Sequence, residues 1–186
     1  MRAFIALDLD EQLKEELYGI QKLLKDNSKR GSWVPQSNFH ITLKFLGNIR
    51  EEEAERIDEV IKGIAIETTP ISLTLDNLGY FNHVNGEYRV LWLGVRGELD
   101  QLFRLYDIME REMKKIGYPM ERRKFTPHIT LGRRIRTSYS FDKLEELIHY
   151  KLGRDFLLDN ISLMKSEEIM RKRVYTPIKI HKFKGE

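Results

Sequence analysis

FHITLKFLG at positions 39–47 and FTPHITLGR at positions 125–133 share the tetrapeptide His-Ile-Thr-Leu. The two copies begin at His40 and His128, which are 88 positions apart (128 − 40). One copy could arise by chance, whereas a repeat with the same partners indicates a duplicated half-domain. We therefore expect one imidazole from each half to meet in a shared site, because two histidines can supply both an acid and a base near neutral pH.

Apolar and polar residues alternate around the first histidine. This period of two predicts a half-buried strand, in which His40, Thr42 and Lys44 share one face. The same alternation places Phe45 on the core side with Ile41, unless a bulge turns it outward. Lys44 could then add positive charge beside His40. The second copy alternates in the same way, so its imidazole and hydroxyl also share a face.

The two motifs suit phosphodiester chemistry. Hydrolysis of a phosphodiester needs a base that deprotonates water and an acid that protonates the departing oxygen, on opposite sides of phosphorus. It also needs donors to the nonbridging oxygens, a role that fits Thr42 and Thr130. An isolated histidine in a strand is more often structural. Two copies with identical partners favour the functional interpretation, although their symmetry leaves the acid and base roles open.

The composition indicates one ordinary folded domain. The chain has 186 residues, 41% of them hydrophobic and 33% charged, so we expect a single two-lobed domain over residues 1–186. It has no cysteine, which excludes disulfides, zinc–thiolate sites and cysteine nucleophiles. No stretch approaches the ~18 apolar residues of a membrane span. The acidic residues near the start do not fit a signal peptide, and we expect a cytoplasmic monomer with no membrane association.

Basic residues are concentrated around the second motif, although the net charge is only +3. Arg122, Arg123 and Lys124 precede it, and a second group follows it: Arg133, Arg134 and Arg136. Runs of charge are often only solvated surface. Two runs that bracket a candidate catalytic histidine instead predict an anionic substrate. A third cluster, residues 171–173, lies in a predicted hairpin near the end of the chain.

Hydrophobic periodicity and turn residues predict an α+β order of elements. We expect helices over 10–26, from 51 onward, over 98–116 and over 141–151. Residues 27–38 are predicted to form a loop, and residues 82–87 a turn-rich connection. Besides the two motif strands, the predicted strands cover residues 2–9, 71–75, 89–95, 155–165 and 172–183.

Together the two motifs resemble those of the 2H phosphoesterase superfamily. Arg2–Leu9 and Val34-Pro35 further resemble its bacterial and archaeal RNA 2′,3′-cyclic phosphodiesterase branch, whose members are also named 2′-5′ RNA ligases. The resemblance covers nearly the whole chain. It implies a bilobal, LigT-like α+β fold: two antiparallel sheets related by a pseudo-two-fold axis, with helices outside and a central cleft.

The resemblance also implies an activity and roles for residues. The expected reaction is metal-independent hydrolysis of RNA 2′,3′-cyclic phosphates to 2′-phosphates, with reversible ATP-independent 2′-5′ ligation as a related reaction. By resemblance, His40 is the proton donor and His128 the proton acceptor. Arg133, with the two threonines, contacts the phosphate, and an aromatic such as Phe45 lies near the nucleobase. No cofactor is implied. Expected partners are RNA ends, such as tRNA fragments, or small cyclic nucleotides.

Two other functions remain open on the sequence. In the first, His40 and His128 are ligands of a metallohydrolase, but no carboxylate or third histidine accompanies them and threonine is a poor ligand. In the second, the cleft only binds nucleotides or RNA, although binding alone would not need a histidine in both motifs. Insensitivity to chelators would exclude the first, and loss of turnover in His40→Ala would exclude the second. For the two-histidine reaction we expect a bell-shaped pH dependence around pH ~6.5.

Overall fold

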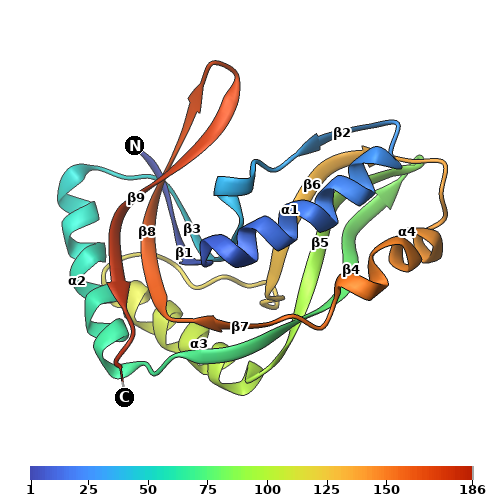
Figure 1. Ribbon diagram of the computed structural model, residues 1–186. Coiled ribbons are helices and arrows are strands. Elements are labelled where there is room, and N and C mark those ends of the chain that lie inside the picture. Colours follow the sequence, from blue (N-terminus) through green and yellow to red (C-terminus); the bar gives the residue numbers. More distant parts are fainter. Residues whose placement is uncertain (186) are drawn as a thin grey trace.

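The computed structural model describes residues 1–185 and contains four α-helices and nine β-strands (Figure 1). The helices are α1 (Glu11–Asp26), α2 (Glu51–Glu67), α3 (Leu99–Lys115) and α4 (Phe141–Ile148). The strands are β1 (Arg2–Asp8), β2 (Arg30–Trp33), β3 (His40–Asn48), β4 (Ile71–Val84), β5 (Glu87–Gly97), β6 (His128–Arg136), β7 (Asp155–Leu158), β8 (Asn160–Ile169) and β9 (Lys172–Lys182). The predicted α+β class is therefore confirmed.

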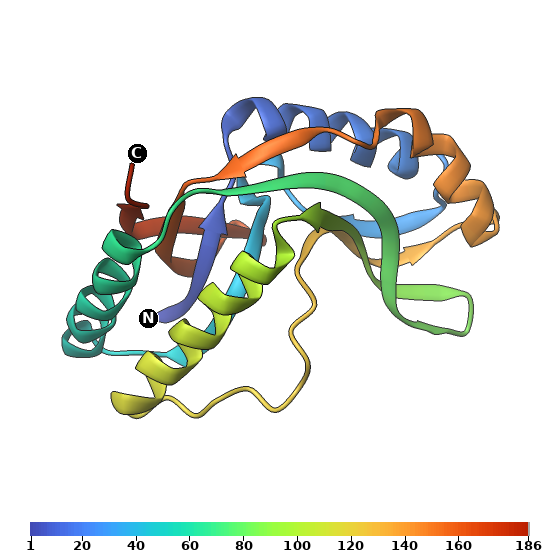
Figure 2. The same ribbon diagram turned by 90° about the horizontal axis from the view of Figure 1, so that it is seen from below.

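The two motif strands lie at the centre of the sheet. Its order is β7-β4-β5-β6-β3-β1-β8-β9, with β2 paired to β6 beside this path. β3 and β6 meet through a single register pair, Ile41 with Ile129. The two antiparallel sheets expected for the two lobes are thus joined at this pair into one curled sheet, and the helices lie outside it (Figure 2).

The order of elements repeats along the chain, but the two lobes are interleaved. The series β1-α1-β3-α2-β4 is followed by a similar series, β5-α3-β6-α4-β8. β4 pairs with β5, and β8 pairs with β1, so each series gives its last strand to the other lobe. This exchange is consistent with a pseudo-two-fold relation. Each lobe therefore contains strands from both halves of the sequence.

Helix α1 shows why these segments form helices. The side chain of Asp10 accepts a hydrogen bond from the backbone N–H of Leu13 at 2.8 Å and thereby caps the first turn. The apolar stripe of this helix, which includes Leu17 and Leu24, is fully buried. Gln21 on the same helix is buried too, and its amide donates to the carbonyls of Val34 and Leu131 at 2.7 and 2.8 Å. The helix thus fixes the backbone of the second motif strand and of the segment that follows β2.

Several element boundaries differ from the prediction. Residues 30–33 lie in a predicted loop but form β2, because the sheet offers them the free edge of β6. The predicted strand 155–165 is divided into β7 and β8. β4 extends to Val84 and β5 already begins at Glu87. The predicted connection over residues 82–87 is therefore reduced to a tight turn at Asn85-Gly86. In residues 1–185 no helix is both long and apolar enough to cross a membrane; the cytoplasmic location and the monomeric state stay predictions.

Candidate active site

The two motifs place their histidines and threonines on one face of the sheet. Because Ile41 is paired with Ile129 in antiparallel register, His40 is set opposite Thr130 and Thr42 opposite His128. Both isoleucines are fully buried on the other face. The alternation predicted for the start of each motif is confirmed, and the structure brings the four predicted residues together on the exposed side of adjoining strands.

Each imidazole is held by the backbone two residues before it. Nδ1 of His40 lies 2.7 Å from the carbonyl oxygen of Asn38, and Nδ1 of His128 lies 2.6 Å from that of Thr126. Because a carbonyl only accepts, both Nδ1 atoms carry the hydrogen, and each Nε2 is the atom available for chemistry. Nε2 of His40 accepts a hydrogen bond from the Thr42 hydroxyl at 2.7 Å.

Burial keeps both rings neutral in the free protein. Desolvation lowers the pKa of His40 to about 4, against a smaller opposing effect of the Asn38 carbonyl. Desolvation also lowers the pKa of His128, and the nearby positive charge of Arg133 lowers it further. A bound phosphate would reverse this balance, because its negative charge favours the imidazolium form. Both rings are therefore neutral bases at pH 7 when no anion is bound.

Aromatic side chains surround each histidine, and sequence reasoning did not identify them as part of the site. Phe4 and Tyr175 lie 5.0 and 5.3 Å from the His40 ring, between ring centres. Phe81 meets the His128 ring edge-on at 4.9 Å, and Trp92 lies 5.8 Å from it. These residues come from β1, β9, β4 and β5, so only the strand order, which the sequence does not give, brings them to the motifs.

A β-bulge corrects the predictions for Lys44 and Phe45. Along β1, Ile5 pairs with Lys44 and Ala6 with Thr42, which leaves Leu43 as the extra residue. The bulge reverses the alternation after Thr42. Phe45, predicted in the core, is 71% exposed, and Lys44, predicted on the His40 face, is only 8% exposed. The exception named in the prediction, a bulge that turns Phe45 outward, is the arrangement observed.

The second motif strand contains the same bulge. On β5, Leu91 pairs with Gly132 and Trp92 with Thr130, so Leu131 is the extra residue. Arg133 is consequently exposed, at the position that corresponds to Phe45. Gly132 takes the buried position that corresponds to Lys44. A Cβ atom there would come within 2.9 Å of the side chains of Trp33 and Ile135, so the close packing requires glycine.

Lys44 has a structural partner instead of a place beside His40. Its Nζ lies 2.7 Å from Oε1 of Glu110 on α3, and it donates to the carbonyl of Pro119 at 2.8 Å. Oε2 of Glu110 accepts from the backbone N–H of Glu121 at 2.6 Å. This buried network ties the bulge of β3 to the connection that leads from α3 to His128. The ring of Phe125, in the same connection, stacks on Tyr106 at 4.1 Å.

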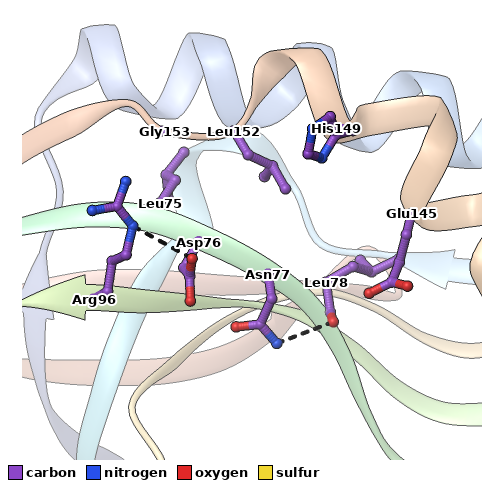
Figure 3. Close-up of a pocket in the computed structure, with 9 residues that line it drawn as sticks. All are labelled: Leu75, Asp76, Asn77, Leu78, Arg96, Glu145, His149, Leu152 and Gly153. Carbon is purple, nitrogen blue, oxygen red and sulfur yellow. Dashed lines mark hydrogen bonds and ion pairs between the residues drawn. The ribbon is translucent and has the colours of Figure 1, made fainter.

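A hollow beside β4 and α4 lies away from the two histidines. It has a volume of about 500 Å³, and Figure 3 shows Asp76, Arg96, Glu145 and His149 around it. Asp76 and Arg96 form an ion pair at 3.5 Å. None of the motif residues lines this hollow. Within residues 1–185, no three His, Cys, Asp or Glu side chains form a group that could hold a metal ion.

An α+β fold with a curled sheet, and with a histidine–threonine pair on each of its two central strands, defines the class of 2H phosphoesterases. The comparison with known families agrees: the family described as LigT like Phosphoesterase matches residues 7–92 and 93–175. The chain belongs to this family. The family resemblance read from the two motifs is thereby confirmed.

Relatives and solved structures cover most of the chain. A protein of Methanothermobacter thermautotrophicus named RNA 2′,3′-cyclic phosphodiesterase is 32% identical over 185 residues, 97% of each chain. A Thermotoga maritima protein of the same name is 36% identical over 148 residues, 80% of this chain and 76% of its own. The crystal structure of a Thermus thermophilus protein superposes with a TM-score of 0.81 at 27% identity, over 100% of both chains. Escherichia coli LigT complexed with 3′-AMP gives 0.78 at 25% identity, over 98% of this chain and 97% of its own.

Proposed function

We propose that this protein hydrolyses RNA 2′,3′-cyclic phosphates to 2′-phosphates without a metal ion, using His40 and His128 as the acid–base pair. The observation that carries the proposal is the placement of both imidazoles on one face, each oriented by a backbone carbonyl at its Nδ1. The relatives named RNA 2′,3′-cyclic phosphodiesterase support the substrate, and the complex of LigT with 3′-AMP supports a nucleotide in the cleft.

In the proposed reaction, Nε2 of His128 accepts a proton from water while the water oxygen bonds to phosphorus. The bond from phosphorus to the 3′ oxygen breaks, and His40 donates a proton to that oxygen, which leaves a 2′-phosphate. Among residues 1–185, no hydrogen-bond partner holds Nε2 of His128, so its lone pair is available to a water. Thr42, Thr130 and Arg133 would stabilise the charge on the nonbridging oxygens.

The same groups could catalyse ligation. If the 5′-hydroxyl of a second RNA replaces the water, its oxygen bonds to phosphorus and the 3′ oxygen leaves with the proton from His40. The product is a 2′-5′ linkage, and no ATP is consumed because the cyclic ester supplies the activated phosphorus. Microscopic reversibility makes both directions available to one acid–base pair. The outcome then depends on whether water or a hydroxyl occupies the position beside His128.

The direct test is hydrolysis of an RNA oligomer that ends in a 2′,3′-cyclic phosphate, in the presence of EDTA. We expect turnover to a 2′-phosphate at the same rate with and without the chelator. A rate that falls with EDTA and returns with a divalent cation would contradict the metal-independent mechanism. RNA binding with no turnover would instead support the binding-module function. A 3′-phosphate product would show that the other ring bond is broken.

The lowered pKa values predict an acidic pH optimum for kcat/KM, which reports the free enzyme. Above both pKa values both rings are neutral and the acid is missing, so kcat/KM falls as pH rises. Below both pKa values, of which that of His40 is about 4, both rings are protonated and the base is missing. We expect a bell with its maximum below pH ~6.5, the ordinary histidine value. The kcat profile should lie at higher pH, since bound phosphate raises both pKa values; a kcat/KM that rises between pH 7 and 9 would contradict the prediction.

A further inference from the structure

Five arginines gather where β2, β5 and the end of β6 lie side by side, and we call them the arginine cluster: Arg30, Arg89, Arg133, Arg134 and Arg136. Figure 1 shows β2 running beside the end of β6. The only acidic residue on these strand segments is Glu87, so the net charge of the group is +4 (5 − 1). The cluster begins at Arg133, whose charge acts on His128, and continues along β6 away from that histidine.

The register sets like charges against each other in the arginine cluster. Arg30 is paired with Arg136 across β2 and β6. Arg89 is set opposite Arg134, because the flanking pairs join β5 and β6 in regular register. Like charges directly opposite each other destabilise a sheet. Glu87 compensates only part of this positive charge. It forms ion pairs with Arg136 at 3.2 Å and with Arg89 at 3.4 Å.

Arg134 adds backbone strain to this repulsion. Its φ is +54°, a left-handed conformation that is unfavourable for a residue with a long side chain. Within the described residues 1–185, no carboxylate lies within ion-pair distance of Arg30, Arg133 or Arg134. The other two basic clusters are neutralised in part, since Arg123 faces Glu121 at 3.6 Å and Arg173 faces Glu168 at 3.8 Å. Repulsion and strain kept beside the candidate active site indicate an anionic ligand.

We propose that the arginine cluster binds the phosphate backbone of the RNA strand upstream of the cyclic end, with Arg30 and Arg134 as contacts beyond the reacting phosphate. From Thr130 to Arg136 the strand rises about 20 Å, which extends past a single nucleotide. This inference rests on the proposed function and specifies its substrate. The preferred substrate is an oligonucleotide rather than a small cyclic nucleotide, and the preference arises from binding outside the reacting centre.

The test compares two substrates: adenosine 2′,3′-cyclic phosphate and a short RNA oligomer that ends in the same nucleotide. The variant is Arg30→Gln with Arg134→Asn, because asparagine tolerates the left-handed backbone and removes the charge. The matched control is Arg56→Gln with Lys62→Gln, two exposed positions on α2. We expect the variant to raise KM for the oligomer at least about tenfold, with kcat unchanged. In the same variant, KM for the mononucleotide should change less than about twofold. The control variant should leave KM unchanged for both substrates.

Salt dependence supplies a second readout. Each lost contact to a single-stranded phosphate should reduce the slope of log(kcat/KM) against log[salt] by about 0.7 for the oligomer. An equal loss of kcat/KM for both substrates would overturn the proposal while the proposed function stands. A loss of kcat/KM no larger than that in the α2 control would do the same. If the wild type hydrolyses neither substrate, the proposed function fails. RNA binding by the arginine cluster is then tested by measuring the affinity of the same variants for a fluorescent RNA oligomer. An affinity equal to that of the wild type would overturn the proposed binding.

Discussion

His40→Ala and His128→Ala are each expected to lower the hydrolysis rate of an RNA 2′,3′-cyclic phosphate by about 10²–10⁴-fold, the usual contribution of a positioned general acid or base. The double variant should lose little more than either single variant, because the two rings act in one step. Single-turnover rates with a saturating RNA oligomer would measure this. His149→Ala is the matched control, since that exposed histidine lines the hollow beside β4 and α4, away from both motifs. Small and additive losses would show that the acid–base pair lies elsewhere.

A modified substrate separates the two roles. His40 has a pKa of about 4, and taken alone this low value favours its neutral form and the role of a base. The assignment of His40 as proton donor comes from the family resemblance. If the 3′ bridging oxygen is replaced by sulfur, the leaving thiolate needs no proton. This substrate should restore the rate of His40→Ala but not that of His128→Ala, and the opposite pattern would exchange the roles.

Glu110→Ala should destabilise the fold by about 3–5 kcal/mol, because it leaves the ammonium of Lys44 buried without its partner. The side chains of Lys44 and Glu110 are only 7% and 2% exposed, and Nζ of Lys44 lies 2.7 Å from Oε1 of Glu110. The variant also removes the acceptor of the Glu121 N–H. Urea unfolding followed by tryptophan fluorescence would measure the loss as a lower midpoint with an unchanged m-value.

Two comparisons make this prediction specific. Lys22→Ala removes an exposed ion pair with Asp26, at the same distance of 2.7 Å, and should leave the urea midpoint nearly unchanged because solvent screens this pair. Lys44→Met combined with Glu110→Leu should be more stable than Glu110→Ala alone, because no charge is left buried. A loss in Glu110→Ala no larger than that in Lys22→Ala would mean that water reaches the Lys44 ammonium.

The central part of the site could be predicted because it depends on local pattern. The alternation of apolar and polar residues is enough to predict that His40 shares a face with Thr42. The repeat of the motif then indicates the second half of the site. The prediction stopped being correct at Lys44, where one extra residue in β3 reverses the alternation. No residue type marks this bulge in the sequence. It becomes visible only in the pairing with β1, which is a long-range contact.

The surroundings of the site could not be predicted for a similar reason. Tyr175 reaches His40 because β9 pairs with β8 and β8 pairs with β1, and each pairing joins distant parts of the chain. β2 was missed since Arg30–Trp33 has no clear alternation and is a strand only through its pairing with β6. Strand order and register therefore decide what local patterns leave open.

The exchange of strands between the lobes determines when the site can exist during synthesis. A nascent chain has both histidines once residue 128 has left the ribosome, but β8 and β9 are made only after that point. Until they arrive, β1 is an unprotected sheet edge and His40 lacks the ring of Tyr175. Pairings over such sequence separations fold slowly. A chain that is cut short before residue 160 should therefore be an inactive target for chaperones and proteases rather than a half-active enzyme.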